Sequence, residues 1–163
     1  APTFRDDPER DGEIMKNFDA QKFSERFSDE YALLIRLHPQ VHTGEVDAGE
    51  SAIDMTGYPD VGELVRICDL LITDYSSICM DFVLLKKPCL FYAFDLEEYE
   101  RERSFFFSYE DYVPGKTAKT FDGLLDMIAS EDFGKDRQEK FREFNFDVFD
   151  GKSAERTVDA IVK

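Results

Sequence analysis

"CDLLITDYSSICMDF", residues 68–82, joins an apolar run to a helix-like pattern through an acid and several hydroxyl groups. Residues 70–73 have the length and composition of a buried strand, and residues 78–85 repeat apolar side chains as a helix packed against that strand does. Residues 74–77, "DYSS", connect the two. A strand that leads directly into a helix is the repeating unit of parallel α/β folds, so this stretch predicts that class.

The rest of the chain repeats this alternation of apolar runs and amphipathic patterns. Further strands are predicted at residues 31–38, 52–56 and 89–94, and further helices at 20–27, 59–69, 95–103, 120–130, 136–146 and 153–163. Asp60, followed by Glu63, has the spacing of a capping box at a helix start. Together these elements predict a Rossmann-like parallel sheet flanked by helices.

The segment "FFFSYEDYVPG", residues 105–115, has no clear period. Its three consecutive phenylalanines indicate either a loop folded onto the domain or a surface that meets a partner. We favour the core-filling interpretation, because large aromatic side chains usually fill a protein interior. The helix at 95–103 is highly charged, and a solvated face explains it.

Length and composition limit the possible functions. The 163 residues, 42% of them hydrophobic, suffice for one sizeable core, so we expect residues 1–163 to form a single domain. The net charge of −16 disfavours binding to nucleic acid or to a membrane surface through basic residues. No apolar run reaches the ~18 residues of a membrane span. Because the chain starts with loop-like sequence and lacks an initiating Met, we expect it to be a piece of a longer protein.

Three cysteines, Cys68, Cys79 and Cys89, lie in apolar segments without C-x-x-C spacing. This pattern favours reduced, buried thiols in a cytosolic protein over a disulfide framework or a metal site.

Ligands of open α/β sheets bind beyond the carboxyl ends of the strands. At one such end lie Thr73 and Asp74, and Ser76 and Ser77 stand where the next helix begins. Free N–H groups at a helix start, together with hydroxyl donors, suit a phosphate or diphosphate. The alternative is that Asp74 and the serines only cap the helix.

Another predicted strand ends at His38, beside Arg36 and before Pro39, a position suited to proton transfer or phosphate contact. His42 has no such setting and is predicted to be an exposed loop residue. The turn around Pro59 could read a base edge, although a plain turn is the simpler interpretation. The cations in "FDGKSAER", residues 149–156, lie at a helix start and indicate either a bound anion or solvated surface charge.

The segments "APTFRD", "RLHP", "DLLITDYSSICMDF", "KKPCLFYAFDLEEYERER", "FSYEDYVPG" and "FDGKSAER", in this order, resemble the carboxy-terminal half of the CDP-glycerol glycerophosphotransferases, the polymerases of teichoic acid synthesis. "LITDYSS" followed by "DF" is the most specific element. The resemblance implies a GT-B type arrangement of two Rossmann-like domains, with this chain as the nucleotide-donor domain. It implies a catalytic role for His38, donor diphosphate contacts for Thr73, Asp74, Ser76, Ser77, Ser153 and Arg156, nucleotide contacts for Arg36, Pro59 and Asp60, and a place in the cleft for Thr3 and Arg5.

The implied reaction is transfer of glycerol phosphate from CDP-glycerol, or ribitol phosphate from CDP-ribitol, to a lipid-linked acceptor, with CMP leaving. No metal cluster is evident, but Mg²⁺ on the donor diphosphate stays open. The family's other essential histidine lies in a Trp-His-Gly motif, and this chain has no Trp, so we expect donor binding without turnover. The full-length protein is expected in the cytoplasm, at the inner face of the membrane and without insertion into it. The alternatives are the donor domain of a nucleotide-sugar transferase and a non-catalytic acidic interaction module.

Overall fold

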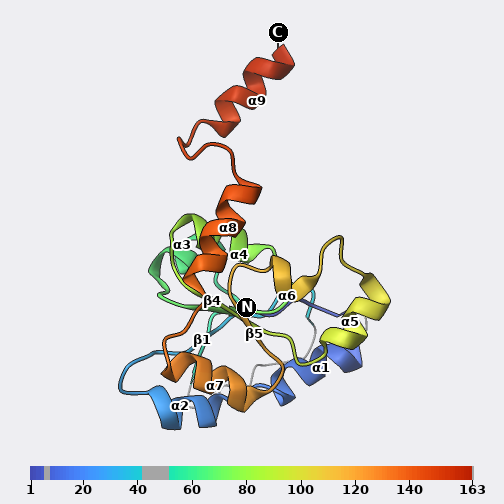
Figure 1. The fold of residues 1–163 in the computed structure, drawn as a ribbon. Helices are drawn as coiled ribbons and strands as arrows, with labels where there is room; N and C mark the ends of the chain where they lie inside the picture. Colours follow the sequence, from blue (N-terminus) through green and yellow to red (C-terminus); the bar gives the residue numbers. More distant parts are fainter. Residues whose placement is uncertain (6–7, 42–51, 163) are drawn as a thin grey trace.

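The structure, a computed structural model, describes residues 1–5, 8–41 and 52–162 and has parallel strands flanked by helices (Figure 1). The strands are β1 (Leu34–Ile35), β2 (Ile53–Asp54), β3 (Leu71–Thr73), β4 (Cys89–Tyr92) and β5 (Lys116–Ala118). The helices are α1 (Pro8–Lys16), α2 (Ala20–Phe27), α3 (Val61–Ile67), α4 (Ile78–Leu84), α5 (Leu96–Arg103), α6 (Tyr109–Tyr112), α7 (Phe121–Ala129), α8 (Lys135–Asn145) and α9 (Ser153–Val162). All the predicted helices are present, whereas α1, α6 and β5 have no counterpart in the prediction.

The strands pair in two parallel sheets. β1 pairs with β2, with Leu34 opposite Ile53, and β4 lies between β3 and β5 in the second sheet. The strands predicted at 31–38 and 52–56 are reduced to two residues each, whereas β3 and β4 lie within their predicted ranges. His42 lies outside the described residues.

Helices cover β4 on both sides, which explains its continuous apolar sequence. All four of its residues are buried. Phe91 packs in one cluster with Phe82 of α4, and Leu90 packs in another with Leu124 of α7. Figure 1 shows α3, α4 and α8 on one side of the sheet and α2 and α7 on the other. The predicted α/β class is therefore what the structure shows.

β5 joins the second sheet through a close approach at Gly115. A Cβ atom there would lie 2.0 Å from the carbonyl oxygen of Cys89, so only glycine fits without displacing backbone. The three residues of β5, "KTA", are not an apolar run. A short strand of mixed polarity at a sheet edge gives a weak sequence signal.

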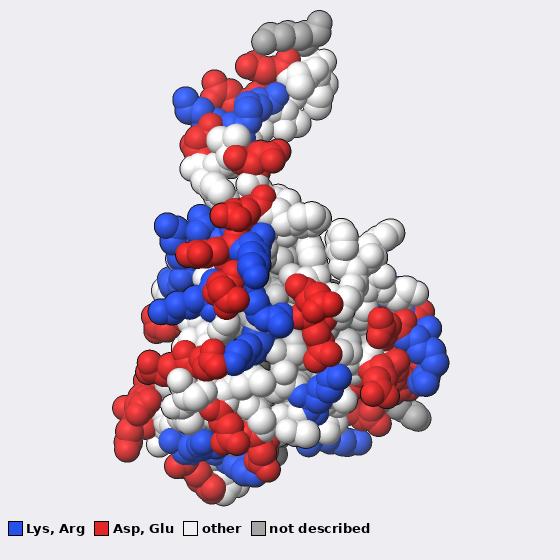
Figure 2. Space-filling view, in the orientation of Figure 1, with Lys and Arg blue, Asp and Glu red and all other residues white. Residues whose placement is uncertain are grey.

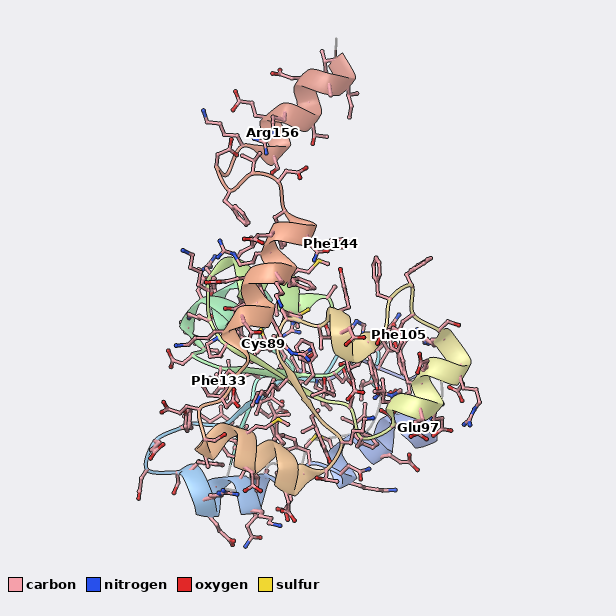
Figure 3. The ribbon with its side chains drawn as sticks, in the orientation of Figure 1. Cys89, Glu97, Phe105, Phe133, Phe144 and Arg156 are labelled. Atoms are coloured by element: carbon pink, nitrogen blue, oxygen red, sulfur yellow. The ribbon has the colours of Figure 1, made fainter. Side chains whose placement is uncertain are left out.

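The three phenylalanines of residues 105–107 divide between core and solvent. Phe105 is half-buried and packs on Tyr109, with 5.1 Å between the ring centroids (Figure 3). Phe106 is fully exposed, and Phe107 is 50% exposed. The core-filling interpretation therefore holds for the first of the three.

The three cysteines are free thiols, as predicted. Cys79 and Cys89 are buried and Cys68 is partly buried. Burial raises the pKa of Cys79 to about 11 and also raises the pKa of Cys89. Both buried thiols are therefore neutral and unreactive at neutral pH.

α9 projects from the rest of the domain (Figure 1). None of its residues is buried, and Ile161 is 77% exposed. Acidic and basic side chains are interspersed along α8 and α9 on the face shown in Figure 2. Among the described residues, no helix has both the length and the apolar composition that a membrane span needs.

Candidate functional site

The loop that follows β3 begins in the core and ends at the surface. Thr73 and Asp74 are each 3% exposed, whereas Ser76 is half-buried and Ser77 is exposed. The Thr73 hydroxyl donates to the carbonyl oxygen of Ala1 at 2.6 Å. The predicted cluster of polar groups is present at this strand end, but only its serine end faces solvent.

Capping does not explain this loop. Ser77 occupies the N-cap position of α4 and makes no side-chain capping bond, while Ser76 Oγ accepts only a long bond of 3.4 Å from the N–H of Ile78. Asp74 Oδ1 instead accepts from the N–H groups of Thr3 and Tyr75, at 2.7 and 2.6 Å. Ser77 therefore presents a hydroxyl that the helix itself does not use.

Arg5 is buried and ties the N-terminal segment to two strand ends. Its Nε and Nη2 donate to the two carboxylate oxygens of Asp95 at 2.9 and 3.1 Å, and its Nη1 donates to Asp74 Oδ2 at 3.1 Å. Burial disfavours the charge, but hydrogen bonds with Asp95 and the charge of Asp74 outweigh it, so the pKa of Arg5 is raised. A two-pronged pair of this kind fixes direction as well as distance.

This arrangement corrects the predicted roles of three residues. Arg5 does not line a cleft, because it is 4% exposed and surrounded by its own partners. The side chains of Thr73 and Asp74 do not reach a solvent-exposed ligand, because both are buried and hydrogen-bonded within the protein. Thr3 lies beside this cluster, and its backbone N–H donates a hydrogen bond to Asp74 Oδ1.

Tyr75 adds an aromatic layer to the same cluster. Its ring stacks on Tyr99 with 3.7 Å between the centroids, and Arg5 Cζ lies 5.0 and 5.2 Å from the two rings. The Tyr75 hydroxyl donates to Asp95 Oδ1 at 2.8 Å. Burial and the charge of Asp95 raise the pKa of Tyr75, so the hydroxyl keeps its proton. The two residues that precede Ser76, Asp74 and Tyr75, are therefore fixed by hydrogen bonds and ring stacking within the protein.

His38 lies three residues beyond the carboxyl end of β1 and is half-buried. Its Nδ1 accepts a hydrogen bond from the N–H of Gln40 at 3.2 Å, so the proton of the neutral ring is on Nε2. Its ring lies 4.7 Å from the ring of Phe4, centroid to centroid. Nε2 is therefore the atom that can act on a ligand.

The N-terminal segment brings His38 and the serine loop to one edge. Phe4 contacts His38, and its neighbour Thr3 bonds Asp74. Adjacent Cα atoms are only about 3.8 Å apart, so the carboxyl ends of β1 and β3 flank the same short segment. We call this edge of the sheets, bordered by His38, residues 3–4 and Ser76–Ser77, the strand-end crevice, after the position at which open α/β folds bind their ligands.

The predicted nucleotide contacts lie beside β2. Arg36 Nη2 donates to the carbonyl oxygen of Tyr58 at 3.4 Å, and its Nε is buried without a partner. Asp60 caps α3 by accepting from the N–H groups of Gly62 and Glu63, so the predicted cap is confirmed. Pro59 is exposed, and nothing in its contacts marks it for base recognition.

The structure does not bring Ser153 and Arg156 to the strand-end crevice. Both lie on the projecting helix α9, and Figure 3 shows Arg156 far from the sheet. Arg156 Nη1 bonds both carboxylate oxygens of Asp150 at 2.8 Å, which lowers the pKa of Asp150. Asp150 therefore accounts for the positive charge of Arg156 at this helix start without a bound anion. This agrees with the interpretation of the segment as solvated surface charge.

Sequence reasoning missed Asp95, the acid that organises the cluster. Its side chain is 11% exposed, although the charged helix that follows it indicated a solvated face. Asp95 comes directly after the strand predicted at residues 89–94, as Asp74 comes directly after the strand at 70–73. The rule that polar residues at strand ends gather at one edge could have found it.

The acids nearest the crevice are a poor fit for a metal ion. Asp74 and Asp95 already accept hydrogen bonds from Arg5, and its charge compensates theirs. Among the described residues, no group of three or more His, Cys, Asp and Glu side chains could hold a metal. We therefore assign no catalytic step to a protein-bound metal.

A comparison with protein families matches residues 1–163 to the family described as CDP-Glycerol:Poly(glycerophosphate) glycerophosphotransferase. The teichoic acid poly(ribitol-phosphate) polymerase of Bacillus spizizenii is 34% identical over 166 residues, which are 99% of this chain and 27% of that protein. The teichoic acid glycerol-phosphate transferase of Staphylococcus aureus is 33% identical over 171 residues, covering 100% of this chain and 44% of that protein. The chain thus spans less than half the length of these relatives.

Solved structures of the wall teichoic acid polymerase TagF share the fold. One has a TM-score of 0.78 and 29% identity, covering 99% of this chain and 41% of the TagF chain. Another, a variant soaked with CDPG, has a TM-score of 0.75 and 30% identity, covering 99% of this chain and 40% of the TagF chain. The predicted fold class, a Rossmann-like part of a GT-B type fold, is confirmed. The chain belongs to the CDP-glycerol:poly(glycerophosphate) glycerophosphotransferase family.

Proposed function

We propose that this chain is a donor-binding domain and holds CDP-glycerol or CDP-ribitol with the diphosphate in the strand-end crevice. In the full-length protein, the bound donor transfers its polyol phosphate to a polyol-phosphate acceptor carried on a lipid, and CMP leaves. This activity takes place in the cytoplasm, at the inner face of the membrane.

The proposal depends mainly on one observation. His38 and the loop that contains Ser76 and Ser77 lie at the same edge of the sheets, on either side of residues 3–4. Ligands of doubly wound folds bind at such strand ends. Ser77 is exposed and makes no capping bond, so its hydroxyl can donate to a phosphate oxygen. The family membership and the TagF structure soaked with CDPG support the same class of ligand.

The chemistry is phosphoryl transfer to a hydroxyl group. The acceptor oxygen attacks the phosphorus that bears the polyol, a new P–O bond forms, and the P–O bond to CMP breaks. Such a reaction depends on positioning and on neutralising charge. Hydroxyl donors from Ser76 and Ser77 orient the diphosphate, and the Nε2–H of His38 faces the charge that develops on CMP.

Arg5, Asp74 and Asp95 act indirectly in this scheme. They fix the backbone that precedes Ser76 and touch no substrate atom. Arg36 and the turn at Pro59–Asp60 border the nucleotide at the end of β2. Ser153 and Arg156 are not assigned to the donor, because α9 does not approach the crevice. A Mg²⁺ ion carried on the diphosphate stays a prediction, which binding with and without EDTA tests.

Calorimetric titration of the chain with CDP-glycerol tests the proposal. The variant Ser76→Ala/Ser77→Ala is expected to bind at least about 10-fold more weakly, because a single hydrogen bond to a charged group contributes about 1.5–3 kcal/mol and about 1.4 kcal/mol is tenfold in affinity. Ser130→Ala is the matched control, because Ser130 is an exposed serine at the end of α7. It is expected to bind like the unaltered chain.

Competing ligands separate the alternatives. A nucleotide-sugar transferase would bind UDP-sugars more tightly than CDP-glycerol or CDP-ribitol. An acidic interaction module would bind none of them, and the serine variant would leave a partner's binding unchanged. Equal CDP-glycerol affinity of the serine variant and the unaltered chain would contradict the proposed site.

A further inference from the structure

The groups that border the strand-end crevice, an imidazole and the serine hydroxyls, carry no permanent charge. Arg5 is buried among its own acidic partners, and Arg156 lies on the projecting helix α9. The chain as a whole carries a net charge of −16, so its overall field disfavours an anionic ligand. A diphosphate in the crevice therefore needs a positive charge that is supplied close by.

Arg103 is the last residue of α5 and lies on the inward face of that helix. Leu96 and Tyr99 are buried and define this face. Arg103 follows Tyr99 by four positions, which places the two side chains on the same side of the helix. Arg101 lies on the opposite side of the helix from Tyr99, because two positions correspond to about 200° around the axis. The solvated face that the sequence indicated is therefore the face of Arg101.

The guanidinium group of Arg103 reaches the histidine border of the crevice through one aromatic ring. Arg103 Cζ lies 5.5 Å from the centroid of the Phe4 ring. The same ring contacts His38, with 4.7 Å between the two ring centroids. Phe4 thus holds a cation and the imidazole on a single side chain.

A second series of contacts joins Arg103 to the loop that contains Ser76. Its Cζ lies 5.8 Å from the centroid of the Tyr99 ring. Tyr99 stacks on Tyr75, with 3.7 Å between the ring centroids, and Tyr75 directly precedes Ser76 in the sequence. The cation is therefore connected to both borders of the crevice, through different rings, and lies beside the position that we assign to the diphosphate.

Contact with aromatic rings suits an arginine that also binds an anion. A cation–π contact uses the face of the planar guanidinium, whereas its N–H groups lie in the plane and point outward. The rings thus orient the group without accepting its hydrogen bonds. Arg103 is exposed to solvent, so a ligand can approach it.

The backbone directly after Arg103 is strained. Ser104 has φ 60° and ψ 162°, a conformation that residues other than glycine rarely adopt. Its N–H still donates to the carbonyl oxygen of Glu100, and the next residue, Phe105, packs on Tyr99 with 5.7 Å between the ring centroids. Strain of this kind persists only where surrounding contacts impose it, and it is concentrated at ligand sites. The position of Arg103 at the end of α5 is therefore fixed by its neighbours.

We propose that Arg103 binds the diphosphate of the donor in the strand-end crevice, and that Phe4 is a positioning residue for both Arg103 and His38. This inference rests on the proposed function and adds the cation that the diphosphate needs. Negative charge develops on the phosphate of CMP as its P–O bond breaks, and the guanidinium compensates that charge without giving up a proton.

A structural role for Arg103 is the competing explanation. A cation in the last turn of a helix interacts favourably with the helix dipole, and stacking on rings stabilises the fold. The two roles depend on different properties of the side chain. Arg103→Lys keeps the positive charge but loses the planar group, whereas Arg103→Met keeps a long apolar side chain over the rings and loses the charge.

Calorimetric titration of these variants with CDP-glycerol tests the assignment. Arg103→Met is expected to bind at least about tenfold more weakly than the unaltered chain, the loss expected for one hydrogen bond to a charged group. Arg103→Lys is expected to bind more tightly than Arg103→Met, because an ammonium group still attracts the diphosphate. Arg101→Met is the matched control, since it removes the same charge from the opposite face of α5. It is expected to bind within about twofold of the unaltered chain.

The outcomes separate this inference from the proposed function. If the unaltered chain binds CDP-glycerol and Arg103→Met binds equally well, the assignment of Arg103 is wrong and the proposed function stands. If the unaltered chain does not bind CDP-glycerol, both are wrong.

Three further results would overturn the assignment alone. Equal losses in Arg103→Lys and Arg103→Met would attribute the effect to packing, and an equal loss in Arg101→Met would attribute it to net charge. Loss of the folded circular dichroism spectrum in Arg103→Met would show that the fold itself requires Arg103.

Discussion

Removal of the Arg5 side chain is expected to cost a large part of the domain's stability. The guanidinium makes four hydrogen bonds, two with Asp95, one with Asp74 and one with the carbonyl oxygen of Thr3. In Arg5→Ala, Asp74 remains 3% exposed in the fold without its cationic partner. Leaving one buried charge uncompensated costs about 3–5 kcal/mol, which is a large fraction of the stability of an ordinary domain.

Urea unfolding followed by circular dichroism measures this change. Arg5→Ala is expected to lower the free energy of unfolding by about 3–5 kcal/mol with an unchanged denaturant slope. Arg5→Lys keeps the charge but cannot bond both oxygens of Asp95, so an intermediate loss is expected. Lys22→Ala is the control, because Lys22 and its partner Asp122 have side chains that are 49% and 73% exposed, and it is expected to leave the free energy of unfolding almost unchanged. A loss of less than about 1 kcal/mol in Arg5→Ala would refute this reasoning.

Three further predictions concern the Ala1 amine beside β3, the residue before β5, and a glycine of α1. In the 163-residue chain, the amine of Ala1 has a pKa of about 6 when folded and 8.0 when unfolded, so the unfolded state holds more protons between these values. Stability is expected to rise by about 2 kcal/mol from pH 6 to pH 8, and acetylation of the amine is expected to abolish that rise in urea titrations. Gly115→Ala is expected to destabilise the domain in the same assay, because the new Cβ meets the Cys89 carbonyl oxygen. Gly12→Ala meets nothing within 4 Å in α1 and is expected to stabilise by about 0.5–1 kcal/mol.

The sequence predicts the elements that carry strong local signals. β3 and β4 are apolar runs covered on both faces, and α4 follows β3 with its apolar side chains at helical spacing. The cap at Asp60 is equally local. Each of these depends on residues that are neighbours in the sequence, so pattern and spacing suffice to find them.

The elements without a prediction lack such signals. α1 contains Pro8 and Gly12, which indicate a loop, yet Pro8 occupies the first position of the helix, where proline fits well. β5 is short and mixed in polarity, and its place in the sheet depends on the contact between Gly115 and Cys89. Only the folded chain brings these two residues together.

The candidate site follows the same division. The strand-end rule places His38 and Ser77 at one edge without any structure. The rule does not show that Asp74 and Asp95 bind Arg5 and are therefore not free to bind a ligand. Arg5 and Asp95 are 90 positions apart in the sequence, so their pairing is visible only in the folded chain. Nor does the spacing of Arg156 show that Asp150 neutralises it on a helix that projects from the domain.

Nuclear magnetic resonance of the ¹⁵N-labelled chain during titration with CDP-glycerol tests the central claim most directly. If the diphosphate binds in the strand-end crevice, the amide signals of Ser76, Ser77 and Ile78 shift together with those around His38, and those of α9 stay in place. Saturable shifts confined to α9, or no shift at residues 76–78 at saturating CDP-glycerol, would contradict the account.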